Sequence, residues 1–237
     1  MIRIVFLGTG VAVNVANKAQ QSILMEDDRL ILIDCGYGTM LRLHQAGYSV
    51  SDLDAIILTH FHLDHCGELM GILKARWLNN AGKIDIYSPV GGKEIFEYFL
   101  LASRYLNGKL KCKIHEIRDG ESFSVGNMRF RARKTVHSVE SMACIIEDLL
   151  ISGDTSAFPE LYEDVNFAIH EMSLDFGGKP DFHTSPENFA ENAHSIERAW
   201  LIHLYPPAYR NRDTISGFLE KKGISVHFPD DSDRIDL

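Results

Sequence analysis

The stretch His60-Phe61-His62-Leu63-Asp64-His65 decides the interpretation of this chain, because it places four metal-binding side chains within six residues. It directly follows Ala55-Ile56-Ile57-Leu58, a short apolar run typical of a buried strand. In an extended chain, residues two apart point to the same side, so His60 and His62 present their imidazoles together. Imidazole nitrogen and carboxylate oxygen suit zinc or another first-row divalent cation. The stretch therefore predicts part of a metal site at the end of a strand.

Six residues cannot complete a catalytic site, so further ligands must come from elsewhere in the chain. The same pattern, an acid or an imidazole at the end of an apolar strand, recurs at His137, Asp154 and His203. Side chains at strand ends meet where the loops of a packed α/β scaffold converge. We therefore expect these three side chains to join the first group.

Length and composition are those of an ordinary globular protein. The 237 residues are 45% hydrophobic and 24% charged, and we expect one hydrolase domain over residues 1–237. The apolar runs are too short to cross a bilayer, and Met1–Gly8 enters a strand pattern without a signal-peptide cleavage site. The four cysteines are scattered without a Cys-x-x-Cys pair. This favours buried thiols in a reducing cytoplasm over a membrane or secreted protein.

The charge distribution bears on the partners of the chain. The net charge is −9, and an acidic protein is a poor general partner for nucleic acid or an anionic membrane. Two stretches that alternate between basic and apolar residues, within 109–114 and 128–136, each predict a half-exposed strand. Their basic residues are Lys109, Lys111, Lys113, Arg129, Arg131 and Arg133. The basic strands 109–113 and 129–133 either attract a polyanion or protect a sheet edge, and we favour protection.

The rest of the chain alternates short apolar runs with helical spacing. Strands are predicted at 2–7, 22–26, 29–33, 55–58, 84–87, 109–114, 128–136, 142–147, 149–152, 167–169, 200–202 and 224–228. Helices are predicted at 39–46, 67–78, 93–101 and 214–221, and two more begin at Pro159 and Pro186. Ser185-Pro186-Glu187 is the strongest helix start, because a serine cap precedes proline and an acid in the first turn.

The motif His-x-His-x-Asp-His with a downstream histidine, aspartate and histidine resembles the metallo-β-lactamase superfamily. The similarity runs nearly end to end, through residues 6–10, 32–36, 152–155, 169–171 and 201–203. Within the superfamily, the chain is most similar to ribonuclease Z and its short relatives. The resemblance implies an α/β fold with four layers, an αββα sandwich in which two sheets pack face to face between outer helices. It also implies two metal ions at one edge of the sandwich.

The resemblance assigns each ligand to a metal. The first metal would be held by His60, His62 and His137, the second by Asp64, His65 and His203, and both by a bridging Asp154. Two divalent cations about 3.5–4 Å apart can share one water, lower its pKa and clamp a phosphoryl oxygen. Zn²⁺ is the metal that we expect, although the same set of ligands also accepts Mn²⁺ or Fe²⁺.

Three residues are expected to act on the substrate or on the attacking water. Asp64 would accept the proton of that water with the oxygen that does not bind metal. By family analogy, His183 would be the general acid that protonates the leaving oxygen, and Glu171 would orient it. We expect Asp34 to orient one imidazole N–H at the site.

The chain departs from ribonuclease Z in one informative place. That family carries a flexible arm for the tRNA elbow in the strand pair before its Ser-Gly-Asp element, whereas residues 146–150 here form a tight turn. We therefore expect a dinuclear, metal-dependent phosphodiesterase for a small phosphodiester or an RNA end, with tRNA a doubtful partner. Two alternatives stay open: a hydrolase of lactones, carboxylic esters or thioesters, and a metal-bearing sensor with vestigial hydrolysis. A homodimer is one assembly state that the sequence allows.

Overall fold

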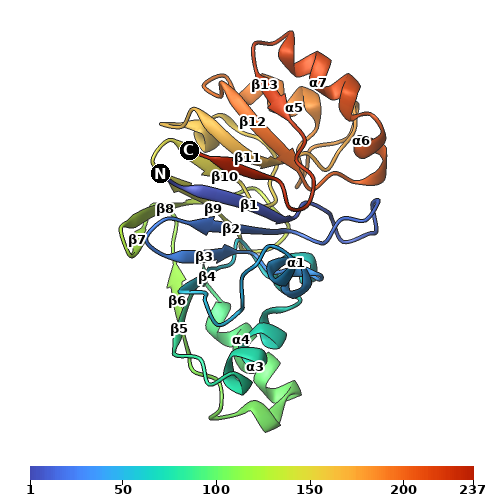
Figure 1. Ribbon diagram of the computed structural model, residues 1–237. Helices are drawn as coiled ribbons and strands as arrows, with labels where there is room; N and C mark the ends of the chain where they lie inside the picture. The colour runs from blue at the N-terminus through green and yellow to red at the C-terminus, as the bar shows by residue number, and fades with distance from the viewer.

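Two seven-stranded sheets pack face to face in the computed structural model, which describes residues 1–237 (Figure 1). The first contains β1 (Arg3–Gly8), β2 (Ser22–Glu26), β3 (Leu30–Ile33), β4 (Ala55–Ile57), β5 (Ile84–Pro89), β6 (Cys112–Ile117) and β14 (Arg234–Asp236). The second contains β7 (Ser122–Val125), β8 (Met128–Lys134), β9 (Met142–Ile146), β10 (Leu149–Ile151), β11 (Phe167–Glu171), β12 (Arg198–Ile202) and β13 (Ser225–His227). Their strand orders are β14-β1-β2-β3-β4-β5-β6 and β13-β12-β11-β10-β9-β8-β7.

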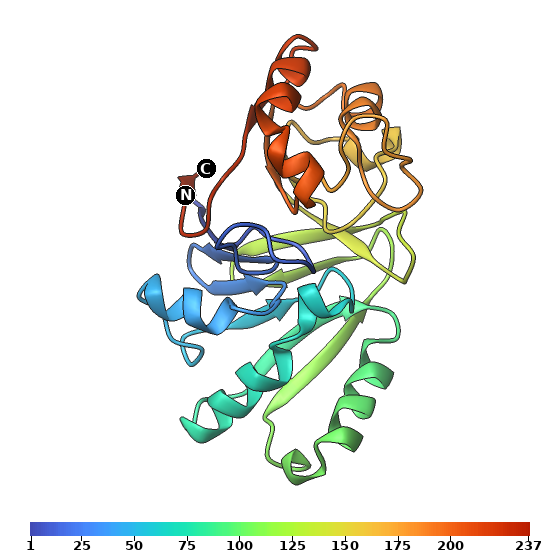
Figure 2. The same cartoon turned by 90° about the vertical axis from the view of Figure 1, so that its right-hand side faces the viewer.

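Helices cover the outer face of each sheet. The segments are α1 (Thr39–Gln45), α2 (Leu63–Cys66), α3 (Leu69–Leu78), α4 (Gly92–Ala102), η1 (Arg104–Leu106), η2 (Pro159–Tyr162), α5 (Pro186–Asn192), α6 (Pro206–Arg210) and α7 (Arg212–Glu220). In the edge view, α1, α3 and α4 lie below the first sheet, and α5, α6 and α7 lie above the second (Figure 2). The layers therefore follow the order α, β, β, α, and the predicted fold class is confirmed.

The strands are apolar on both faces because each sheet lies between two layers. In β1, Ile4 and Phe6 belong to the core between the sheets, whereas Val5 and Leu7 pack under the helices of the first sheet. All four side chains have no exposed surface. Successive residues of a strand point to opposite faces, so a continuous apolar run fills two layers at once.

Parallel strands bring the functional segments to one edge. In the first sheet β3 runs parallel to β4, with Ile33 opposite Ile57. In the second sheet β10, β11 and β12 run parallel, with Glu171 opposite Ile202. The carboxyl ends of parallel strands meet at the same edge of a sheet. The loops that follow β3, β4, β10, β11 and β12 therefore converge.

The predicted strand at 109–114 starts too early. β6 begins at Cys112, so Lys109 and Lys111 precede it and the predicted basic strand 109–113 is wrong in its boundary. The ammonium group of Lys109 lies 4.8 Å from the ring centre of Trp77, at the end of α3. An aromatic ring attracts a cation at this distance, and Lys109 packs on α3 outside the sheet.

The basic residues of β8 mostly make local contacts. Arg131 Nη1 lies 3.6 Å from Asp164 Oδ2, and Arg133 Nη1 donates to the Leu161 carbonyl at 2.8 Å. The contacts agree with an outer face that holds neighbouring loops in place.

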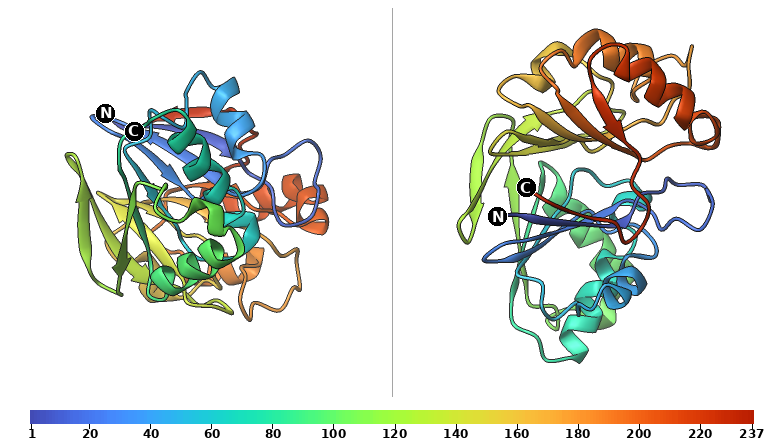
Figure 3. Two further views of the ribbon diagram at one scale, coloured as in Figure 1. Left: turned by 90° about the horizontal axis from the view of Figure 1, so that it is seen from below. Right: turned by 45° about the horizontal axis from the view of Figure 1, so that its top comes forward.

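Several elements have weak sequence signals. β7, β14, α2 and α6 are not predicted, and the helix expected at Pro159 is a single turn of 3₁₀ helix. β14 pairs with β1, with Arg3 opposite Asp236, so the two termini lie side by side (Figure 3). The predicted cap of α5 is confirmed, because Ser185 Oγ accepts from Asn188 N at 3.3 Å.

All four cysteines are free. None of the helices is both long enough and apolar enough to cross a membrane.

Candidate metal centre

The structure brings all seven predicted ligands to the edge where the strand ends converge. They form two groups, in each of which the ligand atoms lie within 4.8 Å of one another. One group contains His60, His62, His137 and Asp154, and the other contains Asp64, His65 and His203. These are the two sets that the family resemblance implied. Their role as ligands stays a prediction, now supported by their proximity.

Asp154 lies between the two groups and turns one oxygen to each. Its Oδ2 is 3.8 Å from His60 Nε2 and 4.0 Å from His137 Nε2. Its Oδ1 is 3.3 Å from His65 Nε2 and 3.4 Å from His203 Nδ1. Asp154 would therefore be the ligand shared by the two groups if each holds a divalent cation.

The buried polar atoms of this centre fit divalent cations. His60 Nε2 and Asp154 Oδ1 are buried and have no hydrogen-bond partner in the protein, which is rare for buried polar atoms. Burial lowers the pKa of His60, and the neighbouring His65 lowers it further, so the imidazole is neutral. Burial raises the pKa of Asp154, but the histidines around it, His203 first, bring it well below its usual value. Neutral imidazole and ionised carboxylate are the protonation states that bind metal.

Asp34 holds His65 in place. Its carboxylate accepts hydrogen bonds from His65 Nδ1, Thr59 N and Thr59 Oγ1, each at 2.8 Å. His65 Nε2 is thereby directed into the centre, as expected for Asp34. Asp34 follows β3 with a φ of 57°, a left-handed conformation that is unusual outside glycine.

Ser173 orients His203, and the sequence analysis missed it. His203 Nδ1 donates to Ser173 Oγ at 3.0 Å, and the serine hydroxyl donates to the His203 carbonyl at 3.0 Å. The backbone of His203 also has a left-handed φ, 57°, and its N–H donates to the Thr9 carbonyl at 2.9 Å. The one signal in the sequence was the position of Ser173 two residues after Glu171, at the end of β11.

Glu171 holds His183 at the open side of the centre. Its Oε1 accepts from His183 Nδ1 at 3.0 Å and from Thr184 N at 3.1 Å, and its Oε2 accepts from Ser173 N at 2.7 Å. Burial lowers the pKa of His183, but the hydrogen bond and charge of Glu171 and the charge of Asp154 raise it more, to about 9. His183 Nε2 makes no hydrogen bond within the protein, so it is free for a substrate.

His183 is also close enough to serve as a ligand. Its Nδ1 lies 3.9 Å from Asp154 Oδ2, and Asp154, His183 and His203 form a third group of ligand atoms within 4.8 Å. The hydrogen bond to Glu171 occupies this same nitrogen. The geometry therefore favours the predicted role, in which Glu171 binds Nδ1 and Nε2 donates a proton to the leaving oxygen.

Two aromatic residues that the sequence did not indicate stand beside the centre. The Tyr205 ring lies edge-on to His183 and His203, with ring centres 6.1 and 6.2 Å apart. The Phe182 carbonyl accepts from His137 Nδ1 at 3.1 Å, and 48% of Phe182 is exposed. His170, by contrast, is fully buried, and its Nε2 lies 2.9 Å from the Tyr162 hydroxyl.

Known proteins support the fold and the family of this chain. Residues 2–224 match the family model described as "Anti-Pycsar protein Apyc1". Ribonuclease Z of Methanosarcina mazei is 33% identical over 144 residues, which are 60% of this chain and 47% of the relative. The chain thus spans about half the length of the curated relatives that it matches.

Two solved structures show the same fold over almost the whole chain. The metallo-β-lactamase fold protein YhfI of Bacillus subtilis matches with a TM-score of 0.83 at 21% identity. The match covers 99% of this chain and 98% of the YhfI chain. The short form of human tRNase Z has a TM-score of 0.77 at 22% identity and covers 99% of both chains. The predicted resemblance to metallo-β-lactamase fold proteins and ribonuclease Z is confirmed. The Anti-Pycsar protein Apyc1 family model matches all of the chain except its first residue and its last 13. The chain therefore belongs to the Anti-Pycsar protein Apyc1 family.

Proposed function

We propose that this chain is a metal-dependent hydrolase of phosphodiesters that works with two divalent cations. One observation carries the proposal: Asp154 lies between two groups of ligand atoms and turns one carboxylate oxygen to each. The similarity to ribonuclease Z supports a phosphodiester as the substrate.

Six side chains and the shared Asp154 would hold the cations. His60, His62 and His137 would hold one, and Asp64, His65 and His203 the other. Imidazole and carboxylate donors suit Zn²⁺, the metal that we propose, and they also accept Mn²⁺ or Fe²⁺. When bound, such a pair supplies a water of lowered pKa and positive charge for a phosphoryl oxygen.

Asp64 is the side chain placed to accept a proton from the attacking water. Burial raises the pKa of its carboxyl, but the hydrogen bond from His203 and the charge of His65 lower it more, so Asp64 stays ionised near pH 7. Its Oδ2 lies 3.2 Å from His203 Nε2, and its Oδ1 makes no hydrogen bond within the protein. A free carboxylate oxygen beside the reacting water can act as a general base.

His183 is the side chain placed to give a proton to the leaving oxygen. Its Nδ1 is held by Glu171 at 3.0 Å, which leaves Nε2–H for the substrate. A ribose hydroxyl is a poor leaving group unless it is protonated as the bond to phosphorus breaks. A positioned acid typically contributes about 10²–10⁴-fold to such a step.

Small phosphodiesters and RNA ends fit this chain better than an intact tRNA. The strands β9 and β10 are joined by two residues, Glu147 and Asp148, so no arm extends from this hairpin. The net charge of −9 adds no attraction for a long polyanion. We therefore expect a substrate whose contacts lie mainly within the centre.

The decisive experiment compares wild type with Asp154→Ala on bis(p-nitrophenyl) phosphate. We expect metal-loaded wild type to hydrolyse it, and Asp154→Ala to lose bound metal and more than about 100-fold of the rate. Loss of a residue that only hydrogen-bonds to a ligand lowers metal affinity or activity by about 10–100-fold. Loss of a ligand shared by both metals should lower them further. The exposed Asp213 on α7 provides the control Asp213→Ala, which should keep metal and rate.

Two results would overturn the proposal and identify the alternatives. Fast turnover of lactones or thioesters by a metal-loaded protein that is inert toward phosphodiesters would indicate a hydrolase of another ester class. Tight binding of a phosphodiester without turnover would indicate a sensor. Elemental analysis of the purified protein reports the identity and number of the metal ions in the same samples.

A further inference from the structure

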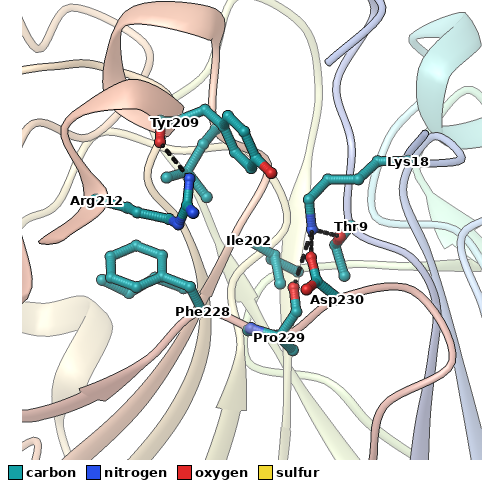
Figure 4. Close-up of a pocket in the computed structure, with 10 residues that line it drawn as sticks. Thr9, Lys18, Ile202, Tyr209, Arg212, Phe228, Pro229 and Asp230 are labelled. Atoms are coloured by element: carbon teal, nitrogen blue, oxygen red, sulfur yellow. Dashed lines mark hydrogen bonds and ion pairs between the residues drawn. The ribbon is translucent and has the colours of Figure 1, made fainter. Parts of the chain in front are cut away.

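A cavity of about 50 Å³ lies next to the segment that carries His203 (Figure 4). It is enclosed by the end of β1, the loop before β2, the end of β12, the start of α7 and the segment after β13. None of the seven predicted ligands lines it, and neither do His183 and Glu171. The catalytic proposal therefore leaves this cavity unexplained.

One of its two cations is fully engaged within the protein. Lys18 Nζ donates to Asp230 Oδ1 at 2.8 Å, to Thr9 Oγ1 at 2.7 Å and to the Pro229 carbonyl at 3.1 Å. An ammonium group has three protons, so these acceptors account for all of them. Lys18 and Asp230 form a neutral pair that builds one wall of the cavity (Figure 4).

The other cation, Arg212, is fixed in place but forms no ion pair within 4.0 Å. The acid that its charge reaches is Asp230, which pairs with Lys18 and whose pKa the Arg212 charge lowers as well. Its Nη1 donates to the Tyr209 carbonyl at 3.0 Å, and its guanidinium carbon lies 4.6 Å from the Tyr209 ring centre. Its Nε and Nη2 make no hydrogen bond within the protein. The side chain is thus held by an aromatic face with donors still free.

The rest of the lining strengthens the field of this guanidinium. Leu201, Ile202, Leu204 and Phe228 form the apolar wall, and Phe228 lies beside Arg212 (Figure 4). Charges interact more strongly beside apolar groups than in open water. A cavity of about 50 Å³ holds roughly three to five waters at the usual minimum of about 10–15 Å³ each, which is the size of a small oxyanion.

We propose that this cavity binds the oxyanion end of a small anionic ligand, a carboxylate or a phosphoryl group, with Arg212 as its anchor. The planar fork of a guanidinium matches two oxygens of either group. The lysine and aspartate pair neutralise each other, so the net charge of the lining is +1 from Arg212. A group larger than phosphate would have to extend out of the cavity.

Titration calorimetry with inorganic phosphate and, separately, with acetate tests the proposal on the metal-loaded protein. We expect Arg212→Gln to weaken binding of at least one of the two anions at least tenfold. Arg212→Lys keeps the charge without the fork and should bind with intermediate affinity. Arg210 is exposed at the end of α6 and does not line the cavity, so Arg210→Gln is the matched control and should bind as wild type does. If the substitution weakens binding of phosphate, the cavity takes a phosphoryl group; if it weakens binding of acetate, the cavity takes a carboxylate.

A second measurement locates the anion. Crystals soaked in selenate, which has the shape of phosphate and an anomalous signal, should show a peak beside the Arg212 guanidinium. Wild-type affinity of Arg212→Gln for both anions, or a selenate peak only among the metal ligands, would overturn the proposal. Hydrolysis of bis(p-nitrophenyl) phosphate should be the same in Arg212→Gln as in wild type, so failure of this proposal is distinguishable from failure of the catalytic one.

Discussion

Asp34 and His65 are joined by a hydrogen bond of 2.8 Å between Asp34 Oδ2 and His65 Nδ1, and both side chains are fully buried. Asp34 also accepts two hydrogen bonds from Thr59, so its carboxylate cannot rotate away. The imidazole is thereby fixed with Nε2 toward Asp154, 3.3 Å from its Oδ1. A histidine that is oriented in this way loses little conformational entropy when it binds a metal.

Removal of this carboxylate should weaken the metal centre without removing a ligand. We expect Asp34→Ala to lower metal affinity by about 10–100-fold, the usual effect of losing the partner of a ligating histidine. Competition with a chromophoric chelator measures the affinity.

The chain offers a matched control for this substitution. Asp85 Oδ1 and His115 Nε2 are also 2.8 Å apart, on neighbouring strands outside the centre. Asp85→Ala removes the same kind of pair and should leave metal affinity unchanged. Equal losses in the two variants would show that general destabilisation, and not orientation of His65, explains the effect.

The role of His183 predicts a dependence on the leaving group. We expect His183→Ala to reduce the rate about 10²–10⁴-fold for a ribose or alkyl leaving group, which needs a proton. With p-nitrophenolate, a stable anion, the same variant should lose much less. The rates of wild type and variant on the two kinds of ester measure this difference.

His194 is exposed in the turn after α5 and makes no side-chain hydrogen bond, so His194→Ala is the control and should behave as wild type. If His183→Ala slows both kinds of ester equally, the residue acts on metal or substrate binding and not as the acid.

Gly153 should not tolerate a side chain, because its backbone conformation disfavours one and the neighbouring Thr59 leaves no space for it. Its φ is +58°, and an added Cβ would lie 2.7 Å from Thr59 Cβ. Left-handed backbone costs an L-residue about 1–2 kcal/mol, and Thr59 is held by Asp34. We expect Gly153→Ala to lower the free energy of unfolding by about 2 kcal/mol or more in urea titrations, with weaker metal binding through the neighbouring Asp154.

Gly217 serves as the comparison for this change. It lies within α7, and an added Cβ would meet nothing within 4 Å. Gly217→Ala should therefore raise the free energy of unfolding by about 0.5–1 kcal/mol, since alanine favours helix. A stable, metal-loaded Gly153→Ala would show that the strand end can shift, against the rigid geometry described above.

Cys112 should react with thiol reagents slowly at pH 8 and faster as the pH rises. Burial raises the pKa of its thiol from about 9 to about 11, so roughly one molecule in a thousand carries the reactive thiolate at pH 8. The rate of reaction with a disulfide reagent should therefore rise about tenfold per pH unit between 8 and 10. The other three cysteines are fully buried and should react only on unfolding.

Cys112→Ser provides the check on this assignment, because it should remove the reaction that the folded protein shows. A plateau in the rate near pH 9 would mean that the thiol is not shielded, and that β6 opens at the edge of its sheet.

Local sequence was sufficient wherever neighbouring residues fix each other. The run Ala55–Leu58 followed by His60 and His62 predicted a strand and two neighbouring candidate ligands, since extended backbone sets the direction of both imidazoles. The cap at Ser185 was equally local, because its bond reaches only to Asn188. The position of His137, Asp154 and His203 in the same centre followed from the convergence of strand ends.

Other features depend on residues far apart in the chain and had no local signal. Ser173 orients His203 across 30 residues, and β14 pairs with β1 across more than 220. The left-handed conformations of Asp34 and His203 exist because the packed strands hold them there, against their local preference.

The sequence alone therefore determined the class of fold, and through the family resemblance it predicted the two sets of ligands and the pairing of His183 with Glu171. Only the tertiary structure decided which partner orients His65 and His203, that Asp154 turns one oxygen to each group, and that Arg212 faces a cavity without forming an ion pair. The reason is physical: apolar periodicity and strand direction are properties of adjacent residues, whereas distances between side chains depend on how the two sheets pack.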